Sequence, residues 1–416
     1  MPIWCWKSPR TGEVVAERAF RARALRVRAL EAAPEFPGAG TRRPLGKGPF
    51  CFPPSSLPEG TGLCDYRSQR GKVTPIFRFD NRFLWAALLS VVALVVSIQV
   101  IRFAPTDRNQ DIYFSFVEGQ RIAAGENPYE RVLEGNFRTN QKYATYFPLF
   151  YELSAVSQIL GLRAYDDWIR FWRVIFGIFD VGITLLLFET CRRRGALLLG
   201  VFAAALWGLG RWSLFVVQIA HLDFIPIFFL LLSLFSLRER PRTALLLFGV
   251  SLAFKQFGIF LAPLYLLWAW QESDGDYKAV LKAGIWIAAI PLITALPFLV
   301  ANAPGFIGSV LFSATRDART HFSAPSVDVA LGLSGVLARL PLLAMLAGVY
   351  ALAATRTTGV YTSCLLVFAA FIDFNPVLYT HYPAWLVPFV VTAPLDAMGD
   401  GSMQGSSPRG ISNQPP

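Results

Sequence analysis

Long apolar runs recur along this chain after Phe77, and they limit the possible folds more than any other feature of the sequence. Several approach the length of about 20 residues with which an α-helix crosses the hydrocarbon of a bilayer. Runs such as Leu84–Val100 and Ile225–Leu237 do not alternate apolar and polar residues, as the strands of a membrane β-barrel do. Only 16% of the 416 residues are charged. We therefore predict an all-α, polytopic integral membrane protein.

The apolar runs divide the chain into three parts. Residues 1–80 are basic and rich in Arg, Pro, Gly and Ser, and we expect a largely disordered cytoplasmic tail there. Residues 81–395 form the membrane domain, with about ten transmembrane helices, and residues 396–416 form a second polar, disordered tail. The apolar stretch Phe147–Leu162 is interrupted by polar residues, so we predict an interfacial helix there. The predicted spans are Phe83–Ile101, Trp168–Cys191, Leu197–Val217, Leu222–Leu237, Ala244–Phe254, Phe257–Trp270, Val280–Val300, Val327–Ala353, Val360–Ile372 and Pro383–Ala393.

The positive charge of the chain predicts its orientation. The formal net charge is +11. In a soluble protein such a balance suggests nucleic acid. Here most of the excess lies in the N-terminal tail and in short turns between apolar runs, such as Arg192–Arg194 and Arg238–Arg242. The positive-inside rule puts those turns and both termini in the cytoplasm. We predict a protein of the cell or inner membrane with membrane lipids as partners and no nucleic-acid partner.

The opposite, outer face is predicted to collect the residues that carry chemistry. It receives all three histidines of the chain together with several acidic and basic side chains. Ionisable groups close to a membrane are costly and usually functional. An outward-facing site is therefore expected. Its residues include Asp107, Asp111, His221, Asp223, Lys255, Arg316, Arg319, His321, Asp373 and His381.

Sequence motifs follow one another along the predicted outer face. After the first membrane helix comes an amphipathic helix, predicted at Asp111–Ala124 and stopped by Gly125 and Pro128. Then come Gly-Glu-Asn-Pro-Tyr, ending at Tyr129, and Tyr-Phe-Pro-Leu-Phe, starting at Tyr146. Later motifs are Gln218 before a Leu-rich hairpin, Lys255-Gln256 between two apolar runs, and His381-Tyr382 before the last run.

The order of these motifs resembles the first lumenal loop and the later turns of GT-C fold glycosyltransferases, and is most similar to glycosyltransferase family 87, the polyprenol-phosphate-mannose-dependent mannosyltransferases. The resemblance covers roughly Phe83–Ala393. It departs from the family pattern in having Tyr-Phe-Pro for Tyr-Pro-Pro and Lys-Gln for Lys-Pro. It implies a GT-C-like helical bundle and an inverting transfer of a hexose, most commonly mannose, from a polyprenyl phosphate donor to a hydroxyl of a glycan or glycolipid acceptor.

The resemblance also implies roles for individual residues. Asp111 is expected to be the general base that takes the acceptor proton, with Asp107 as the second candidate. The donor phosphate would be held by Lys255, Arg316, Arg319, His321 and His381. Substrate contacts are expected from Tyr113, Asn127, Tyr129, Tyr146, Gln218, His221, Asp223, Gln256 and Tyr382. No cofactor is expected, and no metal, because the acidic residues and histidines do not cluster at ligand spacing.

Other interpretations of the same residues remain open. A secondary transporter or lipid flippase would also use broken helices and charges in the membrane, and a non-catalytic membrane subunit is a third possibility. Asp223 could simply cap a helix, and Lys255 could extend to the headgroups. Trp168, Trp172 and Trp385, near helix ends, are predicted to belong to the aromatic belt at the membrane interface.

Overall fold

The computed structural model describes residues 80–101, 111–134, 144–315, 327–375 and 379–398, all within the compact unit Pro75–Pro416. The two predicted tails lie almost wholly outside these residues. Within the described ranges every regular element is a helix and none is a strand, which confirms the all-α prediction.

Five of the described helices are long and apolar enough to cross a membrane. They are Asn81–Val100, Tyr165–Arg193, Leu197–Gln218, Tyr277–Phe312 and Leu337–Ala354. Four shorter apolar helices, of 10 to 17 residues, are Phe224–Ser236, Pro241–Phe254, Val360–Phe374 and Pro383–Ala397. The helix over the predicted interfacial stretch spans only Leu149–Ile159. Its 11 residues are about 16 Å long at about 1.5 Å per residue, too short for a bilayer of about 30 Å.

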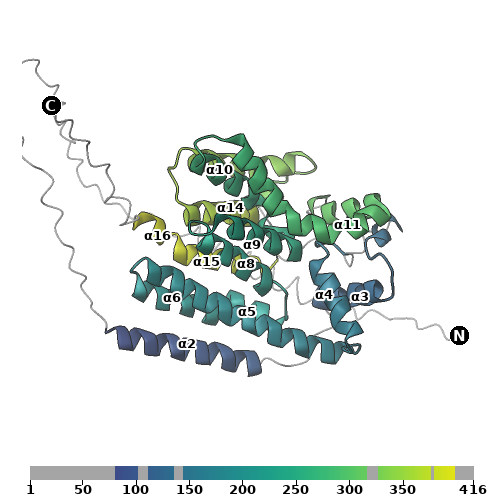
Figure 1. Cartoon of the computed structure of the whole chain (residues 1–416), viewed down its shortest axis with the longest axis horizontal. Helices are drawn as coiled ribbons and strands as arrows, with labels where there is room; N and C mark the ends of the chain where they lie inside the picture. The colour runs from purple at the N-terminus through teal and green to yellow at the C-terminus, as the bar shows by residue number, and fades with distance from the viewer. Residues whose placement is uncertain (1–79, 102–110, 135–143, 316–326, 376–378, 399–416) are drawn as a thin grey trace, which may run out of the picture. The chain divides into compact units, whose positions relative to one another are not determined.

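The long helices form layers (Figure 1). Helices α2, α5 and α6 run alongside one another; α8 packs on α5, α9 packs on α8, and α11 packs on α9. Short helices α3 and α4 pair with each other at one end, where η1 contacts α11. The bounds are α2 Asn81–Ile101, α3 Asp111–Ala123, η1 Glu130–Glu134, α4 Leu149–Ile159, α5 Tyr165–Arg193, α6 Leu197–Leu209, α7 Arg211–Gln218, α8 Phe224–Ser236, α9 Pro241–Phe254, η2 Gln256–Leu261, α10 Ala262–Glu272, α11 Tyr277–Thr315, α12 Val327–Ala330, η4 Leu337–Arg339, α13 Leu340–Ala354, α14 Val360–Phe374, α15 Pro383–Thr392 and α16 Pro394–Ala397.

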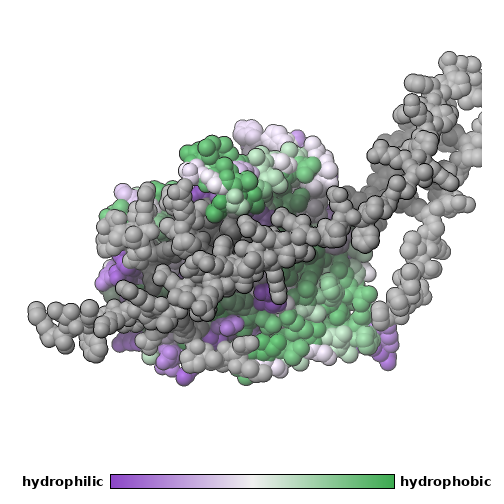
Figure 2. Space-filling view, turned by 180° about the vertical axis from the view of Figure 1, so that it is seen from behind, coloured by the Kyte–Doolittle hydropathy of each residue, from purple (hydrophilic) through white to green (hydrophobic). Residues whose placement is uncertain are grey.

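The outward faces of these helices are apolar, as a lipid-facing surface requires. On α2 the side chains of Phe83, Leu89 and Val100 are more than half exposed, and on α11 so are Ile293 and Val300. Figure 2 shows broad apolar areas on one face of the molecule. A soluble monomer rarely exposes large continuous apolar patches. The surface therefore agrees with a membrane protein.

Two sequence-based boundaries were wrong. The helix predicted to end at Val300 continues further, because α11 bends at Asn302 and extends to Thr315. Asn302 Oδ1 accepts a hydrogen bond from the Gly305 amide at 3.0 Å, and Pro304 occupies the first turn, so the second half has an ordinary helix start. The predicted single span Val327–Ala353 is interrupted where Gly332 and Gly335 take φ values of 68° and 58°, which end regular helix.

Candidate functional site

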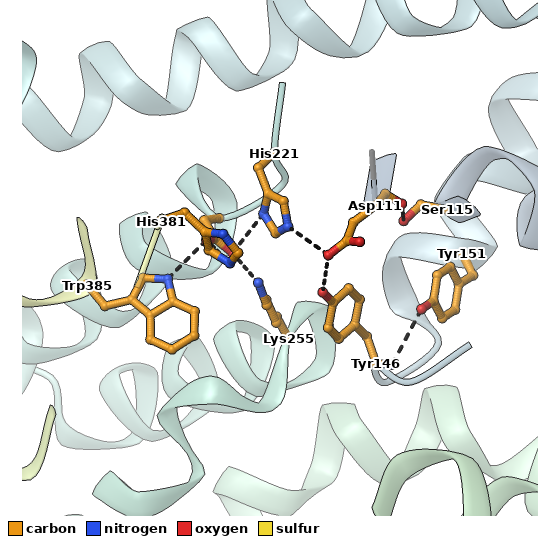
Figure 3. A network of polar contacts seen from close by, with 9 residues as sticks. Asp111, Ser115, Tyr146, Tyr151, His221, Lys255, His381 and Trp385 are labelled. Atoms are coloured by element: carbon orange, nitrogen blue, oxygen red, sulfur yellow. Dashed lines mark hydrogen bonds and ion pairs between the residues drawn. The ribbon is translucent and has the colours of Figure 1, made fainter. Parts of the chain in front are cut away.

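Residues predicted for the outer face converge from five separate places in the chain (Figure 3). Each lies at the start of a helix or at a break between two helices, where the backbone leaves the apolar layer. They are Asp111 at the start of α3, Tyr146 before α4, His221 and Asp223 between α7 and α8, Lys255 between α9 and η2, and His381 before α15.

The buried carboxylate of Asp223 is the centre of this group. Its side chain is 0% exposed, and Lys255 Nζ donates to Oδ1 at 2.6 Å. Trp385 Nε1 donates to Oδ2 at 3.0 Å, and His221 Nδ1 lies 3.1 Å from Oδ1. Burial alone would raise the pKa of Asp223, but the charges of His221 and Lys255 outweigh it and hold the pKa well below its usual range. Asp223 is therefore an ionised anchor for the groups around it.

Asp111 is the solvent-facing carboxylate of the site. Its side chain is 60% exposed, and its Oδ2 lies 3.6 Å from His221 Nε2. Tyr146 Oη donates to the same oxygen at 3.5 Å. The surrounding protein atoms would raise the pKa of Asp111, but contact with His221 and the charges of His221, Lys255 and His381 lower it below its usual range. Asp111 is thus deprotonated at neutral pH and accessible to a ligand, as a general base must be.

The two histidines of the site stack on each other, and their pKa values are shifted in opposite directions. Their ring centroids are 4.6 Å apart with an interplanar angle of 27°. Burial and the charge of His221 lower the pKa of His381 to about 3. Burial also acts to lower the pKa of His221, but the charge of Asp223 and contact with Asp111 raise it above the usual 6.5. Of the two imidazoles, His221 therefore holds a proton more readily, because its pKa is raised by the carboxylates on either side of it.

Lys255 enters the site because α9 ends just before it. Its φ of −161° and ψ of 123° are extended, and η2 starts at the next residue. The side chain is 6% exposed, and Nζ lies 5.0 Å from the ring centroid of Tyr146 and 5.2 Å from that of Trp385. The ammonium therefore points inward to a carboxylate and two aromatic faces, and does not extend to the headgroups. Next to it, Gln256 Nε2 donates to the Thr145 carbonyl at 2.6 Å and ties this break to the segment of Tyr146.

A strained turn holds His221 in place. Helix α7 ends in a Schellman arrangement, in which the His221 amide donates to the Val216 carbonyl and the Ala220 amide to the Val217 carbonyl, each at 3.1 Å. This arrangement puts Ala220 at a φ of 51°, a left-handed conformation that glycine normally occupies. For an alanine it costs roughly 1–2 kcal/mol. The surrounding contacts offset that cost and hold the imidazole against Asp223.

Other predicted substrate residues lie behind the group or away from it. Tyr129 is buried, and its hydroxyl donates to the Tyr146 carbonyl at 2.8 Å, while Asn127 Oδ1 accepts from the Tyr129 amide at 3.1 Å. Tyr129 therefore holds the backbone at Tyr146 in place, and Asn127 positions Tyr129. The ring of Tyr113 packs edge-on against the ring of Tyr165, with the ring centroids 5.0 Å apart.

One more predicted residue lies near the group, one lies at the surface, and others are outside the described residues. Tyr382 stacks on Trp385 at 4.3 Å, whereas Gln218 is exposed at the end of α7. Four predicted residues fall outside the described part of the chain: Asp107, Arg316, Arg319 and His321.

Trp385 is a site residue that the sequence analysis assigned wrongly. It is 2% exposed and donates to Asp223, and Trp168 and Trp172 are also buried, at 0% and 5%. None of the three faces lipid at an interface. One signal was available for Trp385: it follows His381 by four residues at the start of a helix, a spacing that puts two side chains on the same face.

The site also contains the donors of a metal centre. His221, Asp223 and His381 are all buried, and one ligand atom from each lies within 4.8 Å of the others. Two imidazoles and a carboxylate suit zinc or a similar cation. Both oxygens of Asp223, however, already accept hydrogen bonds from Lys255 and Trp385. The ammonium of Lys255 thus supplies the positive charge in this arrangement.

A comparison of the chain with protein-family models, with curated proteins and with solved structures finds no match.

Proposed function

We propose that this protein is an inverting membrane glycosyltransferase that moves a hexose from a polyprenyl phosphate donor to an acceptor hydroxyl, with mannose the leading candidate. The observation that carries the proposal is the position of Asp111. Its carboxylate is exposed while its partner His221 is 3% exposed, so a base that a ligand can reach is backed by a buried, charged group. The motif order that resembles glycosyltransferase family 87 supports the same function.

In the proposed reaction Asp111 accepts the proton of the acceptor hydroxyl. The acceptor oxygen attacks the anomeric carbon as the bond between that carbon and the phosphate oxygen breaks, which inverts the configuration. The bonding pair leaves with the phosphate, and the proton ends on Asp111. Such general-base assistance typically contributes about 10²–10⁴-fold in rate. The adjacent imidazolium of His221 keeps Asp111 ionised before the reaction.

The leaving phosphate gains negative charge and needs cations near it. Lys255 and His221 are the positively charged side chains beside Asp111 among the described residues, and His381 is a neutral donor stacked on His221. We propose that the donor phosphate lies on the side of this group that faces Tyr146. Arg316, Arg319 and His321 remain predicted phosphate ligands.

The proposal includes a GT-C-like bundle in which shorter helices complete the five long ones to about ten spans. It also includes an orientation. The site lies before the first residue of α8, whereas Arg238 and Arg240 follow its last turn. We propose that the arginine end and both termini are cytoplasmic and that the site faces outward.

The test is sugar transfer by the full chain in proteoliposomes, from a labelled polyprenyl-phosphate hexose to an added acceptor. Asp111→Asn should lower the rate by at least about 10²-fold while the protein still folds, because the side chain is largely exposed. The matched control is Asp167→Asn, whose side chain is 63% exposed and belongs to the start of α5. It should retain full activity.

The same assay separates the alternatives. Near-normal transfer by the Asp111→Asn variant would contradict the proposed base. Movement of a labelled lipid or solute across the bilayer without any glycosylated product would instead identify a transporter or flippase.

A further inference from the structure

A cavity of about 320 Å³ lies at the other end of α8 from the candidate site. It opens between the last turn of α5, the residues after α8, the start of α14, and α16. Helix α8 has 13 residues and is therefore about 20 Å long at about 1.5 Å per residue. Since Asp223 directly precedes α8 and Leu237 directly follows it, the cavity and the candidate site are separate and lie at opposite ends of the helical layer.

The polar wall of the cavity is rich in arginine. Arg193, Arg194 and Arg238 line it together with Glu239 and Asp396, so three cations and two anions give it a net charge of +1. Arg193 is held in place: its Nη1 lies 2.8 Å from Glu239 Oε1, and its guanidinium lies 4.2 Å from the ring centroid of Phe235. Its Nε also donates to Glu189 Oε1 at 3.1 Å, so Arg193 is occupied by two carboxylates and fixes this part of the wall.

The second carboxylate of the wall is engaged by the backbone. Asp396 Oδ2 accepts a hydrogen bond from the Thr362 amide at 2.7 Å, at the first turn of α14. A Cβ on Gly359 would collide with this carboxylate, so the glycine lets it approach the helix end. Asp396 thus satisfies the start of α14, where a negative charge is favourable. With three arginines against two carboxylates, the wall keeps a net positive charge.

Most of the remaining wall is apolar, formed by Leu234, Phe235, Leu237 and Val360, with Thr190 and Tyr361 beside them. Inorganic phosphate would leave this part of the cavity unfilled, whereas a phospholipid puts its phosphate beside arginines and its acyl chains beside apolar side chains. Basic cavities between helices at a membrane boundary are suited to anionic headgroups. We propose that this cavity binds the phosphate of an anionic phospholipid, with Arg194 and Arg238 as phosphate ligands and Leu234, Phe235 and Val360 against its acyl chains.

The experiment is native mass spectrometry of the full chain in neutral detergent, titrated with phosphatidylglycerol or with phosphatidylcholine. The wild type should bind phosphatidylglycerol at least about tenfold more tightly, because both lipids carry the phosphate but the choline of phosphatidylcholine puts a further positive charge beside the arginines, and about 1.4 kcal/mol is a factor of ten. The double variant Arg194→Gln/Arg238→Gln should lose this preference. The matched control Arg240→Gln/Arg242→Gln removes the same charge from exposed residues at the same end of α8 that do not line the cavity, and should keep it.

Each contrary result overturns a stated part of the proposal. Equal binding of the two lipids by the wild type would overturn it, even if the double variant failed to fold. Equal loss of preference in the two double variants would show that the arginines act only through general surface charge. Inorganic phosphate that binds lipid-free protein with the same dependence on Arg194 and Arg238, while phosphatidylglycerol shows no preference, would replace the lipid with a soluble phosphate source.

Discussion

Two buried aspartates of this protein have matched surroundings with one difference. Asp223 accepts hydrogen bonds from Lys255 Nζ at 2.6 Å and from Trp385 Nε1 at 3.0 Å. Asp180, within α5, accepts them from Gln99 Nε2 at 2.6 Å and from Trp207 Nε1 at 2.8 Å. They are 0% and 1% exposed. Each thus has one indole donor and one further donor, which is charged for Asp223 and neutral for Asp180.

The charged partners make Asp223 part of an ionisable cluster, whereas the neutral partners of Asp180 connect neighbouring helices. Gln99 and Trp207 belong to α2 and α6, so Asp180 joins three neighbouring helices and touches no other ionisable group among the contacts described. Asp223 contacts Lys255 and His221, and His221 in turn contacts the exposed Asp111. Burial alone therefore does not distinguish the two carboxylates. Charged partners and contact with a group next to solvent do.

The largest expected effect is the loss of the charge on Asp223. Asp223→Asn leaves Lys255 buried without its counter-charge, which typically costs about 3–5 kcal/mol. The double variant Asp223→Asn/Lys255→Met should regain most of the lost stability, because the buried ammonium is removed as well and His221 can release its proton. Denaturant unfolding in mixed micelles measures both. A double variant no more stable than Asp223→Asn would show that the ion pair is not the cause.

The matched change at Asp180 should have a smaller effect and a different character. Asp180→Asn leaves one of two buried donors badly paired, which costs about 1–3 kcal/mol. Sugar transfer per folded molecule should stay within a few-fold of wild type, because the change does not reach Asp111. Loss of transfer in a well-folded Asp180→Asn protein would remove the distinction between the two aspartates.

The two tryptophans allow a finer comparison. Trp385→Phe and Trp207→Phe each remove one indole donor, and each should cost about 1 kcal/mol of stability. Only Trp385→Phe should also slow sugar transfer, because Trp385 lies over Lys255 and orients Asp223. Parallel measurements of unfolding and turnover test this, and equal turnover in the two variants would count against a positioning role for Trp385.

The smallest expected effect is on the pH dependence of stability. The pKa of His221 is raised above 6.5, so its stabilising contribution is complete below pH 6.5 and is lost as the pH rises through the raised value. The melting temperature of wild type relative to His221→Gln should therefore be highest at mildly acidic pH and decline at alkaline pH. Asp180→Asn should keep this dependence. A constant difference between wild type and His221→Gln across the range would show that His221 is not protonated in the folded protein.

The sequence predicted the helices and helix breaks of the site better than the contacts between its side chains. The amphipathic helix expected at Asp111–Ala124 is present as α3, and the break expected at Lys255 separates α9 from η2. Both follow from local patterns of apolar residues, prolines and glycines. The inward direction of Lys255 and the burial of Trp385 were not predictable in this way, because they depend on Asp223, which is 32 residues from Lys255 and 162 from Trp385.

By itself the amino-acid sequence determined that this chain is helical and apolar, and where many of its helices begin and end, since these properties depend on neighbours within a few turns. Only the tertiary structure decided which aspartate is buried against Lys255 and which is exposed to solvent. It also decided that the buried Asp180 has neutral partners. A carboxylate takes its character from the charges and donors within a few ångströms, and folding brings those neighbours from distant parts of the chain.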